Sequence, residues 1–298
     1  MVIIYGPTGV GKSDLACAIA QSFSAEIVNA DMGQLYTPLS IGTAKPNWQA
    51  EQTPHHLFDV LDEPVDCSVV QYRAMLMPVL EEIWNRGNVP LVVGGSGFYI
   101  QSIFYVPKVG DCTDIQSGTW DDLNAVDPKR AAAIHPHDTY RIKRALSIWY
   151  SLGVKPSECV SDITVPCQTD IFWVTRERAE LYARINQRTQ LMVKQGWIDE
   201  CRPLIGTEWE SFLRRKKLIG YPEIFDYLLG KSDLGNTIDS IAQKTRAYAK
   251  RQETFWRTLK RRLVLENKDH VLRTHELNLT LSDPCLYINQ LLKYASNR

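Results

Sequence analysis

The first hundred residues alternate between short apolar runs and longer stretches in which apolar residues recur every three or four positions. The apolar runs predict buried strands at 2–5, 26–30 and 89–93. The periodic stretches predict helices at 13–22 and 68–86, and a further helix beginning near Ser96. Strands that are apolar at every position must be covered on both faces, as in a parallel sheet with crossover helices. The alternation therefore predicts an α/β fold built on a parallel sheet.

The remainder of the chain predicts mostly helices. The stretch 106–119 is rich in Asp, Gly, Ser and Thr and has no period, which predicts a loop at the entrance to a second lobe. One more apolar run, at 170–174, predicts a strand that rejoins the sheet. Helical patterns cover 138–150, 177–195, 197–205, 220–229 and 238–262. We expect a first part of the core at 1–107, a lobe at 108–165, and the completion of the core at 166–298.

A phosphate-binding motif lies between the first predicted strand and the first predicted helix. Its residues are Gly6-Pro7-Thr8-Gly9-Val10-Gly11-Lys12-Ser13, a complete G-x-x-x-x-G-K-[ST] loop, or P-loop. The glycines allow successive backbone N–H groups to point at one anion. Lys12 adds a positive charge, Ser13 a hydroxyl for Mg²⁺, and the helix N-terminus a partial positive charge. The motif and both its flanks predict a phosphate site on a P-loop NTPase-like sheet.

The acidic partner that this loop usually has is missing. Nucleotide hydrolases with a P-loop carry a second buried strand that ends in Asp and helps to hold Mg²⁺. The strand at 89–93 is followed instead by Gly94-Gly95-Ser96-Gly97, whereas the strand at 26–30 is followed by Asp31. Ligands of open α/β sheets bind at the carboxyl ends of strands, so the P-loop, Asp31 and Ser96 are expected to line one crevice. This arrangement favours Asp31 as a general base over an ATPase site, with a helix cap or an indirect Mg²⁺ ligand as the alternative.

Composition sets broader limits on the function. No apolar run approaches the roughly 18 residues that cross a membrane, and the chain enters a strand at once, so we expect neither a membrane partner nor a targeting peptide. The 7 cysteines are an odd number and form no C-x-x-C pair. This argues against a disulfide framework or a zinc site and predicts a reducing, cytoplasmic location.

One predicted helix is strongly basic, although the whole chain balances 34 basic against 34 acidic residues. On the helix at 238–262, the apolar residues Ile241, Tyr248, Phe255 and Leu259 fall on one side. The basic residues Arg246, Lys250, Arg257 and Arg261 fall almost opposite, in a row roughly 22 Å long. A single-signed row of this length fits the phosphates of a nucleic-acid strand. A solvated helix face is the alternative.

Taken together, these residues resemble the tRNA dimethylallyltransferase family, also called tRNA isopentenyltransferases or IPP transferases. The matching segments are GPTGVGKS at 6–13, DMGQLY at 31–36, IGTAKP at 41–46, HHLFDV at 55–60, VGGSGFYI at 93–100, IHPHDTYRIKRAL at 134–146, LIGYPEI at 218–224 and TRAYAKRQETFWR at 245–257. The P-loop is shared with many enzymes. The IGTAKP segment and the basic-helix segment are far more specific, and their order and spacing fit the family.

The resemblance implies transfer of a dimethylallyl group from dimethylallyl diphosphate to N6 of the adenosine on the 3′ side of the anticodon. The tRNAs would be those reading codons that begin with U, and the products N6-dimethylallyladenosine and pyrophosphate. It implies Mg²⁺ as the cofactor, the anticodon stem-loop as the partner, a monomeric enzyme, and a small helical insertion lobe. The stretch 106–120 is short for the family, so the lobe is expected to be reduced.

The family pattern also assigns roles to residues. It implies that Asp31, Lys12 and Ser13 are catalytic, that Ser13 holds the metal, and that the whole P-loop from Gly6 to Ser13 binds diphosphate rather than ATP. The residues that it places against tRNA are Asp31, Met32, Gly33, Gln34, Ser96, Tyr140, Arg141, Ile142, Lys143, Arg144, Lys217, Arg246, Lys250 and Arg251. Ser96 stands where the family usually has Thr and keeps the hydroxyl. Lys217 stands where some relatives have Arg, which keeps the charge but loses the bidentate geometry.

Three other functions remain open at the level of the sequence. A small-molecule P-loop kinase or NTPase would turn over ATP and would carry a carboxylate in place of Gly94. An adenylate dimethylallyltransferase, which acts on free nucleotides, would not need the basic helix. A non-enzymatic RNA-binding protein would leave Lys12 and Asp31 without a role.

Overall fold

The computed structural model describes residues 1–22, 24–107, 117–159, 161–267, 271–286 and 288–289 of the chain. Its centre is a six-stranded sheet in which every neighbouring pair of strands is parallel, in the order β3-β2-β4-β1-β5-β6. The strands are β1 (Val2–Tyr5), β2 (Ala25–Asn29), β3 (His55–His56), β4 (Val89–Gly94), β5 (Thr169–Thr175) and β6 (Leu272–Asn278). The parallel α/β sheet predicted from the sequence is therefore confirmed.

Both faces of this sheet are buried, which explains the uninterrupted apolar runs of its central strands. On one face, Ile3, Val92 and Ile171 belong to a core that also includes side chains of α2 (Val69–Asn85), α3 (Gly97–Phe104) and α11 (Leu234–Glu266). On the other face, a second core brings together neighbouring strand residues with α1 (Lys12–Ala20) and α7 (Arg178–Lys194). Alternate residues of each strand thus enter different cores, and the molecule has three layers.

The predicted strands match the observed ones to within one residue at each end. The predicted helices are also present, and the one at 197–205 divides into α8 (Trp197–Cys201) and a 3₁₀ turn at Arg202–Leu204. The strands and α-helices that had not been predicted are β3, β6, α4 (Trp120–Val126), α5 (Pro128–Ala132) and α9 (Glu208–Lys216). Edge strands and short helices have few apolar positions and therefore give weak patterns.

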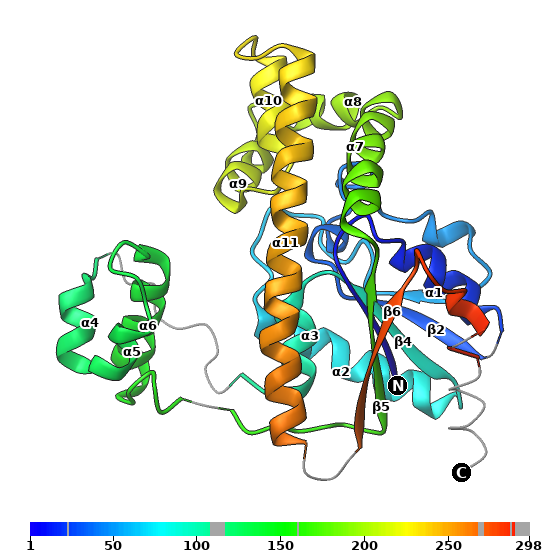
Figure 1. Ribbon diagram of the computed structural model, residues 1–298. Coiled ribbons are helices and arrows are strands. Elements are labelled where there is room, and N and C mark those ends of the chain that lie inside the picture. The colour runs from blue at the N-terminus through cyan, green and yellow to red at the C-terminus, as the bar shows by residue number, and fades with distance from the viewer. Residues whose placement is uncertain (23, 108–116, 160, 268–270, 287, 290–298) are drawn as a thin grey trace.

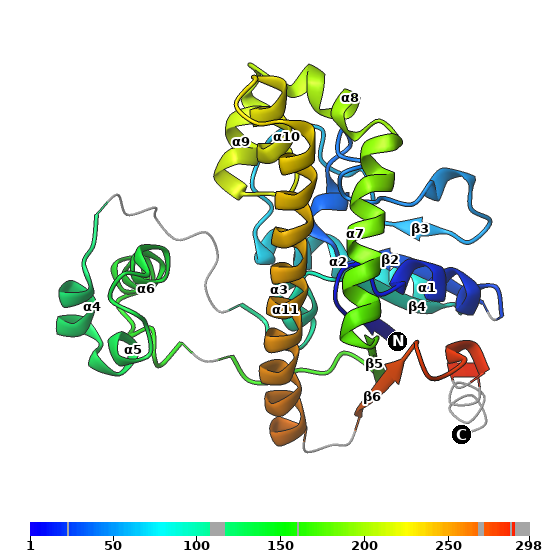
Figure 2. The ribbon, with the colours of Figure 1, turned by 45° about the horizontal axis from the view of Figure 1, so that its top comes forward.

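A small group of helices stands to one side of the main body (Figures 1 and 2). It consists of α4, α5 and α6 (Thr139–Leu152), which pack around their own apolar core. Most of the predicted entrance loop, at 108–116, lies outside the described residues. A bridge between Tyr105 and Ile163 lies where the chain leaves and re-enters the main body.

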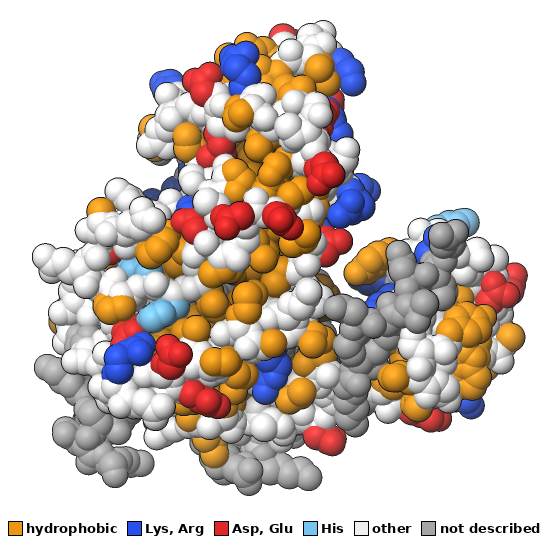
Figure 3. Space-filling model, turned by 180° about the vertical axis from the view of Figure 1, so that it is seen from behind, with side chains coloured by type: hydrophobic (Ala, Val, Ile, Leu, Met, Phe, Trp, Pro, Cys, Tyr) orange, Lys and Arg blue, Asp and Glu red, His pale blue; other side chains and the backbone are white. Residues whose placement is uncertain are grey.

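The longest helix, α11, runs the full height of the molecule beside the sheet (Figure 1). Its upper half contacts α7 and α10 (Tyr221–Leu228), which form a helical cap over the sheet together with α8 and α9. Of the predicted apolar side of this helix, Ile241 and Leu259 are buried and Tyr248 and Phe255 are half-buried, while the neighbouring Ala249 and Trp256 are buried as well. On the face seen from behind, acidic, basic and apolar side chains are intermixed over the body (Figure 3).

Candidate active site

The P-loop connects β1 to α1 at the carboxyl edge of the sheet. Gly9 and Gly11 have φ of 81° and 104°, a conformation that residues with a side chain rarely adopt. A Cβ at Gly6 would press against the carbonyl oxygen of Val174 in β5. These three glycines therefore allow the tight path of the loop. Lys12, the first residue of α1, folds back so that its Nζ donates to the carbonyl of Pro7 at 3.0 Å.

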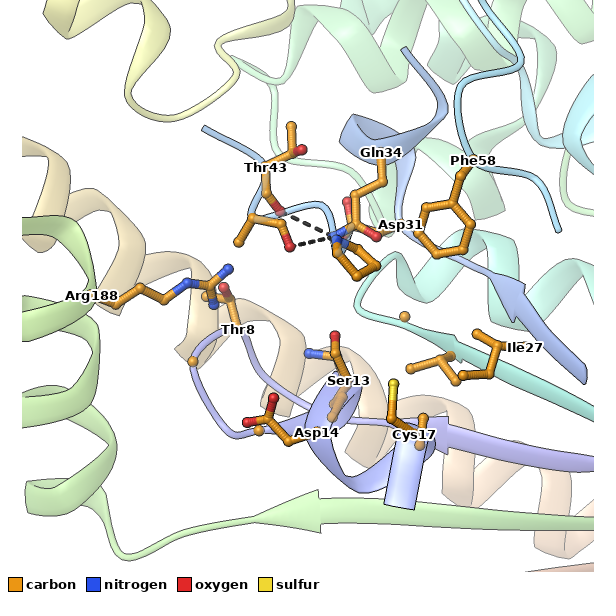
Figure 4. Close-up of a pocket in the computed structure, with 18 of the residues that line it drawn as sticks. Thr8, Ser13, Asp14, Cys17, Ile27, Asp31, Gln34, Thr43, Phe58 and Arg188 are labelled. Carbon is orange, nitrogen blue, oxygen red and sulfur yellow. Dashed lines mark hydrogen bonds between the residues drawn. The ribbon is translucent and has the colours of Figure 1, made fainter. Parts of the chain in front are cut away.

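Arginines from α7 and from the end of β5 surround the loop. Arg176 Nε donates to the carbonyl of Val10 at 2.8 Å, and Arg184 Nε donates to the carbonyl of Gly9 at 3.1 Å. Arg188, one helical turn after Arg184, points into the cavity beside Thr8 (Figure 4). The sequence reasoning missed these residues. Two arginines four positions apart share one face of the predicted helix 177–195, and this pattern could have revealed Arg184 and Arg188.

Asp31 is held at the end of β2 by its neighbours. Its backbone N–H donates to Asn29 Oδ1 at 2.8 Å, and buried Asn29 is itself fixed by donating to the carbonyl of Leu57. One carboxylate oxygen, Oδ1, accepts the N–H of Gly33 at 3.1 Å and caps a 3₁₀ turn. The other, Oδ2, has no hydrogen bond within the described part of the chain. It is therefore available to accept a proton from a ligand.

Burial shifts the pKa values of the charged groups in the site. Burial raises the pKa of Asp31 above its ordinary value, although the positive charge of Lys12 opposes this shift. Burial lowers the pKa of Lys12 to about 8, with Asp31 opposing. The pKa of Arg188 is also lowered by burial, and Asp31 again opposes. The carboxylate is thus more basic than an exposed Asp, and it faces two cations across the cavity.

Ser96 joins the predicted crevice, as expected. Its hydroxyl accepts the backbone N–H of Met32 at 3.0 Å, so the ends of β2 and β4 are tied together next to Asp31. Gln252 of α11, which had not been singled out, ties the P-loop to the same place. Its side chain accepts the N–H of Thr8 and donates to the carbonyl of Gly95, both at 2.9 Å. The N–H of Thr8 is therefore engaged by Gln252.

Two pockets meet at Asp31. The first, the P-loop pocket, has a volume of about 490 Å³ and is lined by the P-loop and Arg184. Apolar Phe58 lines it as well (Figure 4). The second, the helix pocket, has a volume of about 380 Å³ and is lined by α7, α11 and the segment after α9. The residues that line both pockets are Thr8, Gly9, Asp31, Thr43 and Arg188. Asp31 and Arg188 thus stand on a wall common to two compartments.

The residues predicted to contact tRNA are distributed over four places. Met32, Gly33, Ser96, Lys217 and Arg251 line the helix pocket. Gln34 lines the P-loop pocket, where its side-chain amide donates to the carbonyls of Thr43 and Ala44 at 3.1 and 3.2 Å. This amide braces a loop of the chain. The predicted contact of Gln34 with tRNA would therefore have to use the side-chain oxygen, since the NH2 group is engaged.

Two basic residues of α11 lie away from the helix pocket. Lys250 lines a separate hollow with Arg176, and Arg246 donates to Asn186 of α7. Lys250 is exposed and Arg246 is half-buried. Of the basic residues of α11, it is Arg251, outside the predicted basic row, that lines the helix pocket together with Asp31.

The remaining predicted contacts lie on α6 of the lobe. Tyr140 is 79% exposed and Arg141 is also exposed, whereas Ile142 is only 1% exposed. Ile142 packs in the core of the lobe, so its side chain is not offered to a ligand, contrary to the expectation for that position. Arg144 lines a cleft between the lobe and α3. Lys143 is half-buried.

The expected Mg²⁺ site would depend on few protein ligands. The described residues contain no cluster of three His, Cys, Asp or Glu that could hold a metal on its own. Ser13 is exposed at the start of α1 and lines the P-loop pocket. Mg²⁺ is often bound by one or two protein groups together with phosphate oxygens and water. The hydroxyl of Ser13 fits that pattern.

No acidic residue ends either strand beside β1. β4 ends at Gly94, where a Cβ would overlap the backbone of Ala30, and β5 ends at Thr175. A carboxylate could not be accommodated at Gly94 without moving β2. The geometry therefore disfavours the metal site that P-loop hydrolases build on the neighbouring strand.

The sequence profile of one protein family, described as IPP transferase, matches residues 34–259. The chain belongs to this family. Among its relatives, a tRNA dimethylallyltransferase of Bacillus subtilis is 36% identical over 275 residues, which cover 86% of this chain and 87% of the relative. One of Alkaliphilus oremlandii is 34% identical over 280 residues, covering 86% and 88% of the two chains.

Solved structures of the family have the same fold. A tRNA isopentenylpyrophosphate transferase of Bacillus halodurans aligns with a TM-score of 0.69 and 31% identity, covering 99% of this chain and 95% of that one. A eukaryotic dimethylallyltransferase described as acting on tRNA aligns with a TM-score of 0.82 and 28% identity, covering 100% and 80%. The α/β fold and the family resemblance seen in the sequence are both confirmed.

No helix among the described residues is long and apolar enough to cross a membrane.

Proposed function

We propose that this protein is a tRNA dimethylallyltransferase, which transfers a dimethylallyl group from dimethylallyl diphosphate to an adenosine beside the anticodon. In this reaction a bond forms between N6 of adenine and C1 of the allyl group. The bond between C1 and the diphosphate oxygen breaks, its electron pair leaves with pyrophosphate, and a proton leaves N6. We place the activity in the cytoplasm, where tRNA is found.

The observation that carries this proposal is the common wall of the two pockets. A group-transfer enzyme must bring a donor and an acceptor together in one geometry. The P-loop pocket offers a cradle for a diphosphate, and the helix pocket offers an opening lined by basic and apolar residues. Asp31 and Arg188 stand between them. A base entering the helix pocket would meet the allyl group at Asp31.

The donor side would stabilise the leaving group. N6 of adenine is a weak nucleophile, so the C–O bond must stretch early and negative charge gathers on pyrophosphate. The N–H groups of the P-loop, Lys12 and Arg188 would interact with this charge, and one such donor is typically worth about 3 kcal/mol in the transition state. Mg²⁺ bound at Ser13 would add further neutralisation of the diphosphate.

The acceptor side would orient the base and take its proton. Asp31 stands on the common wall with its oxygen Oδ2 free, and burial raises the pKa of its carboxyl, which strengthens it as a base. Enclosure of the site matters because water would otherwise capture the allyl group. A base from the anticodon loop is already unpaired, so extruding it costs little.

The outer surface would hold the tRNA. Exposed basic residues of α11 and the exposed end of α6 are suited to contact phosphates, and Lys217 stands at the rim of the helix pocket. Phosphate contacts of this kind position the nucleic acid without reading its sequence. We expect the anticodon stem-loop to be held between α6 and α11 by a monomeric enzyme.

The proposal is tested by the acceptor that the enzyme selects. The protein is incubated with labelled dimethylallyl diphosphate and Mg²⁺ in parallel with undermodified tRNA, AMP and ATP. Label is expected in tRNA only, at the adenosine next to the anticodon. Label in AMP or ATP alone would show an adenylate dimethylallyltransferase, and ATP turnover without prenyl transfer would show a kinase or NTPase.

A further inference from the structure

Glu200 of α8 holds a loop that belongs to the site, although its own side chain lies outside both pockets. Its carboxylate accepts the backbone N–H groups of Ser40, Ile41 and Gly42, at 2.9, 2.5 and 3.0 Å. It also accepts the hydroxyl of Tyr221 at 2.8 Å. Four donors on one carboxylate, three of them consecutive backbone groups, form a strong anchor for the loop.

The loop is pressed closely against the helical cap at this point. A Cβ at Gly42 would overlap the ring of Trp197 and approach the hydroxyl of Tyr221, so only glycine fits. Trp197 and Tyr221 are both buried. The anchor is therefore shielded from much of the solvent, which strengthens hydrogen bonds to a charged group.

From the anchor, contacts lead to the catalytic carboxylate. The next residue, Thr43, lines both pockets, and its carbonyl and that of Ala44 accept the amide of Gln34. The side chain of Thr43 also packs on Gly33. The N–H of Gly33 donates to Asp31 Oδ1.

Ala44 has φ of 48°, a conformation that is strained for a residue with a side chain. A loop that contains such a residue keeps its shape only when outside contacts hold it. Glu200 supplies such contacts at the amino-terminal side of the loop, through its hydrogen bonds with residues 40–42. Without them, the loop would be free to relax away from the turn that carries Asp31.

We propose that Glu200 is a positioning residue for prenyl transfer: it fixes the 40–44 loop, whose Thr43 belongs to the common wall of the two pockets, and thereby keeps Asp31 aligned with the acceptor. The inference rests on the proposed function. It also links the helical cap, where Glu200 and Lys217 lie, to the place where the reaction occurs.

The test compares Glu200→Gln with two matched variants. Glu200→Gln keeps the size of the side chain but loses its charge and at least one backbone hydrogen bond. Tyr221→Phe removes one donor and leaves the three backbone bonds. Asp199→Asn changes the neighbouring carboxylate, whose side chain is 80% exposed. Each is assayed with tRNA and dimethylallyl diphosphate for kcat, KM and single-turnover rate, and its amide hydrogen exchange is followed by mass spectrometry.

For Glu200→Gln we expect at least about a tenfold loss of single-turnover rate, because small misplacements of reacting groups are costly, with the KM for tRNA within about twofold. Exchange of the amides at 40–42 is expected to accelerate. Tyr221→Phe should lose less than about threefold, and Asp199→Asn should be unchanged. Faster exchange with a normal rate would overturn the positioning role, and so would a rise in the KM for tRNA with kcat intact.

Unchanged exchange would overturn the anchor itself. Because exchange is measured without substrate, it reports on the anchor even if the wild-type protein fails to prenylate tRNA. That failure would count against the proposed function and is therefore separable from the failure of this inference.

Discussion

The backbone N–H of Thr8 donates to the side-chain oxygen of Gln252 across 2.9 Å, although the two residues are 244 positions apart in the chain. The side-chain NH2 group of Gln252 in turn donates to the carbonyl of Gly95, so one side chain of α11 ties the P-loop to the end of β4. Gln252 is only 4% exposed. Its contacts mean that the phosphate cradle is completed by the helix that also carries the basic row.

Replacing Gln252 by Met should therefore loosen the cradle. The change keeps the length of the side chain but leaves the N–H of Thr8 and the carbonyl of Gly95 without partners, at a cost of about 1–3 kcal/mol in the free energy of unfolding. The affinity for pyrophosphate should fall as well. Chemical denaturation and calorimetric titration measure the two effects. Gln243→Met, on the exposed side of the same helix, is the control and should change neither.

Asp31→Asn should separate catalysis from binding. Asn keeps an oxygen that can accept the N–H of Gly33, so the turn is preserved, but it cannot take a proton. The single-turnover rate is expected to fall by at least about 10²-fold, with the affinity for tRNA nearly unchanged. An equal loss in rate and affinity, measured by filter binding, would show that Asp31 is structural.

The pH profile gives an independent check on Asp31. Burial raises the pKa of this carboxyl, so the rate of the wild-type enzyme should rise with pH through a value above the ordinary Asp range near 4. Below that pKa the carboxyl is protonated and cannot act as a base. The residual rate of Asp31→Asn should lack this rising limb.

Lys12 should make the binding of the leaving group depend on pH. Burial lowers the pKa of Lys12 to about 8, so the free enzyme loses this positive charge as the pH rises through that value. The affinity for pyrophosphate should then fall by up to about tenfold between pH 7 and 9 relative to Lys12→Met. In Lys12→Met, the affinity still changes with pH because pyrophosphate itself titrates. The difference between the pH profiles of the two proteins therefore gives the effect of Lys12. Parallel curves for the two proteins would contradict the shift.

The sequence predicted the elements whose patterns are strong. The strands around the P-loop are apolar at consecutive positions because both faces are covered, and α11 shows its apolar side at helical spacing. By contrast, β6 lies at the edge of the sheet with only Leu272 and Leu277 buried, and its sequence Leu-Arg-Thr-His-Glu-Leu-Asn contains only these two apolar residues. Its place in the sheet is set by pairing with β5 along its whole length.

The site was predicted where its residues lie next to one another in the chain or follow strand ends. The P-loop, Asp31 and Ser96 meet because parallel strands end at the same edge. Gln252, Arg188 and Glu200 reach the site from helices far along the chain. Nothing local in the sequence distinguishes Gln252 or Glu200 from ordinary polar positions, since their partners are mainly backbone groups that only the tertiary fold brings close. Arg188 differs in that it shares a helix face with Arg184.

A buried ion cluster at the start of β2 should give the fold an acid-sensitive component of stability. Glu26, 1% exposed, accepts two hydrogen bonds from Arg86 and one each from Asn88 and His56. The hydrogen bonds from Arg86 are the largest cause of a pKa lowered to about 2, with those from Asn88 and His56 adding to it. A lowered pKa stabilises the fold above the unfolded value of about 4.5. That contribution is lost as the pH falls from about 4.5 through about 2.

Glu26→Gln should therefore destabilise the protein at pH 7 by about 1.5–3 kcal/mol, the usual worth of a hydrogen bond to a charged group. The difference from the wild-type protein should be constant above about pH 5 and should shrink between pH 4.5 and 2. Urea denaturation at several pH values measures it. Glu82→Gln is the control, since that carboxylate is 67% exposed and lies 3.9 Å from Arg86. A difference that does not change with pH would contradict the cluster's role.

The two neighbouring cations of α11 should contribute to tRNA binding in different ways. Lys250 is exposed and lines a hollow away from Asp31, whereas Arg251 lines the helix pocket and stacks over the ring of Tyr248 at 5.6 Å. Lys250→Ala should weaken tRNA binding and reduce the slope of log affinity against log salt by about 0.7–1, the effect of losing one phosphate contact. Its single-turnover rate at saturating tRNA should be unchanged.

Arg251→Ala should reduce both the affinity for tRNA and the saturated rate, because its side chain lines the pocket that would receive the base. Filter binding at several salt concentrations and rapid-quench assays separate the two effects. Lys231→Ala, a surface change in the turn after α10, is the charge-matched control and should leave the salt dependence intact. If all three variants lost the same affinity with the same change in slope, general electrostatic attraction would account for binding and α11 would have no specific place in the interface.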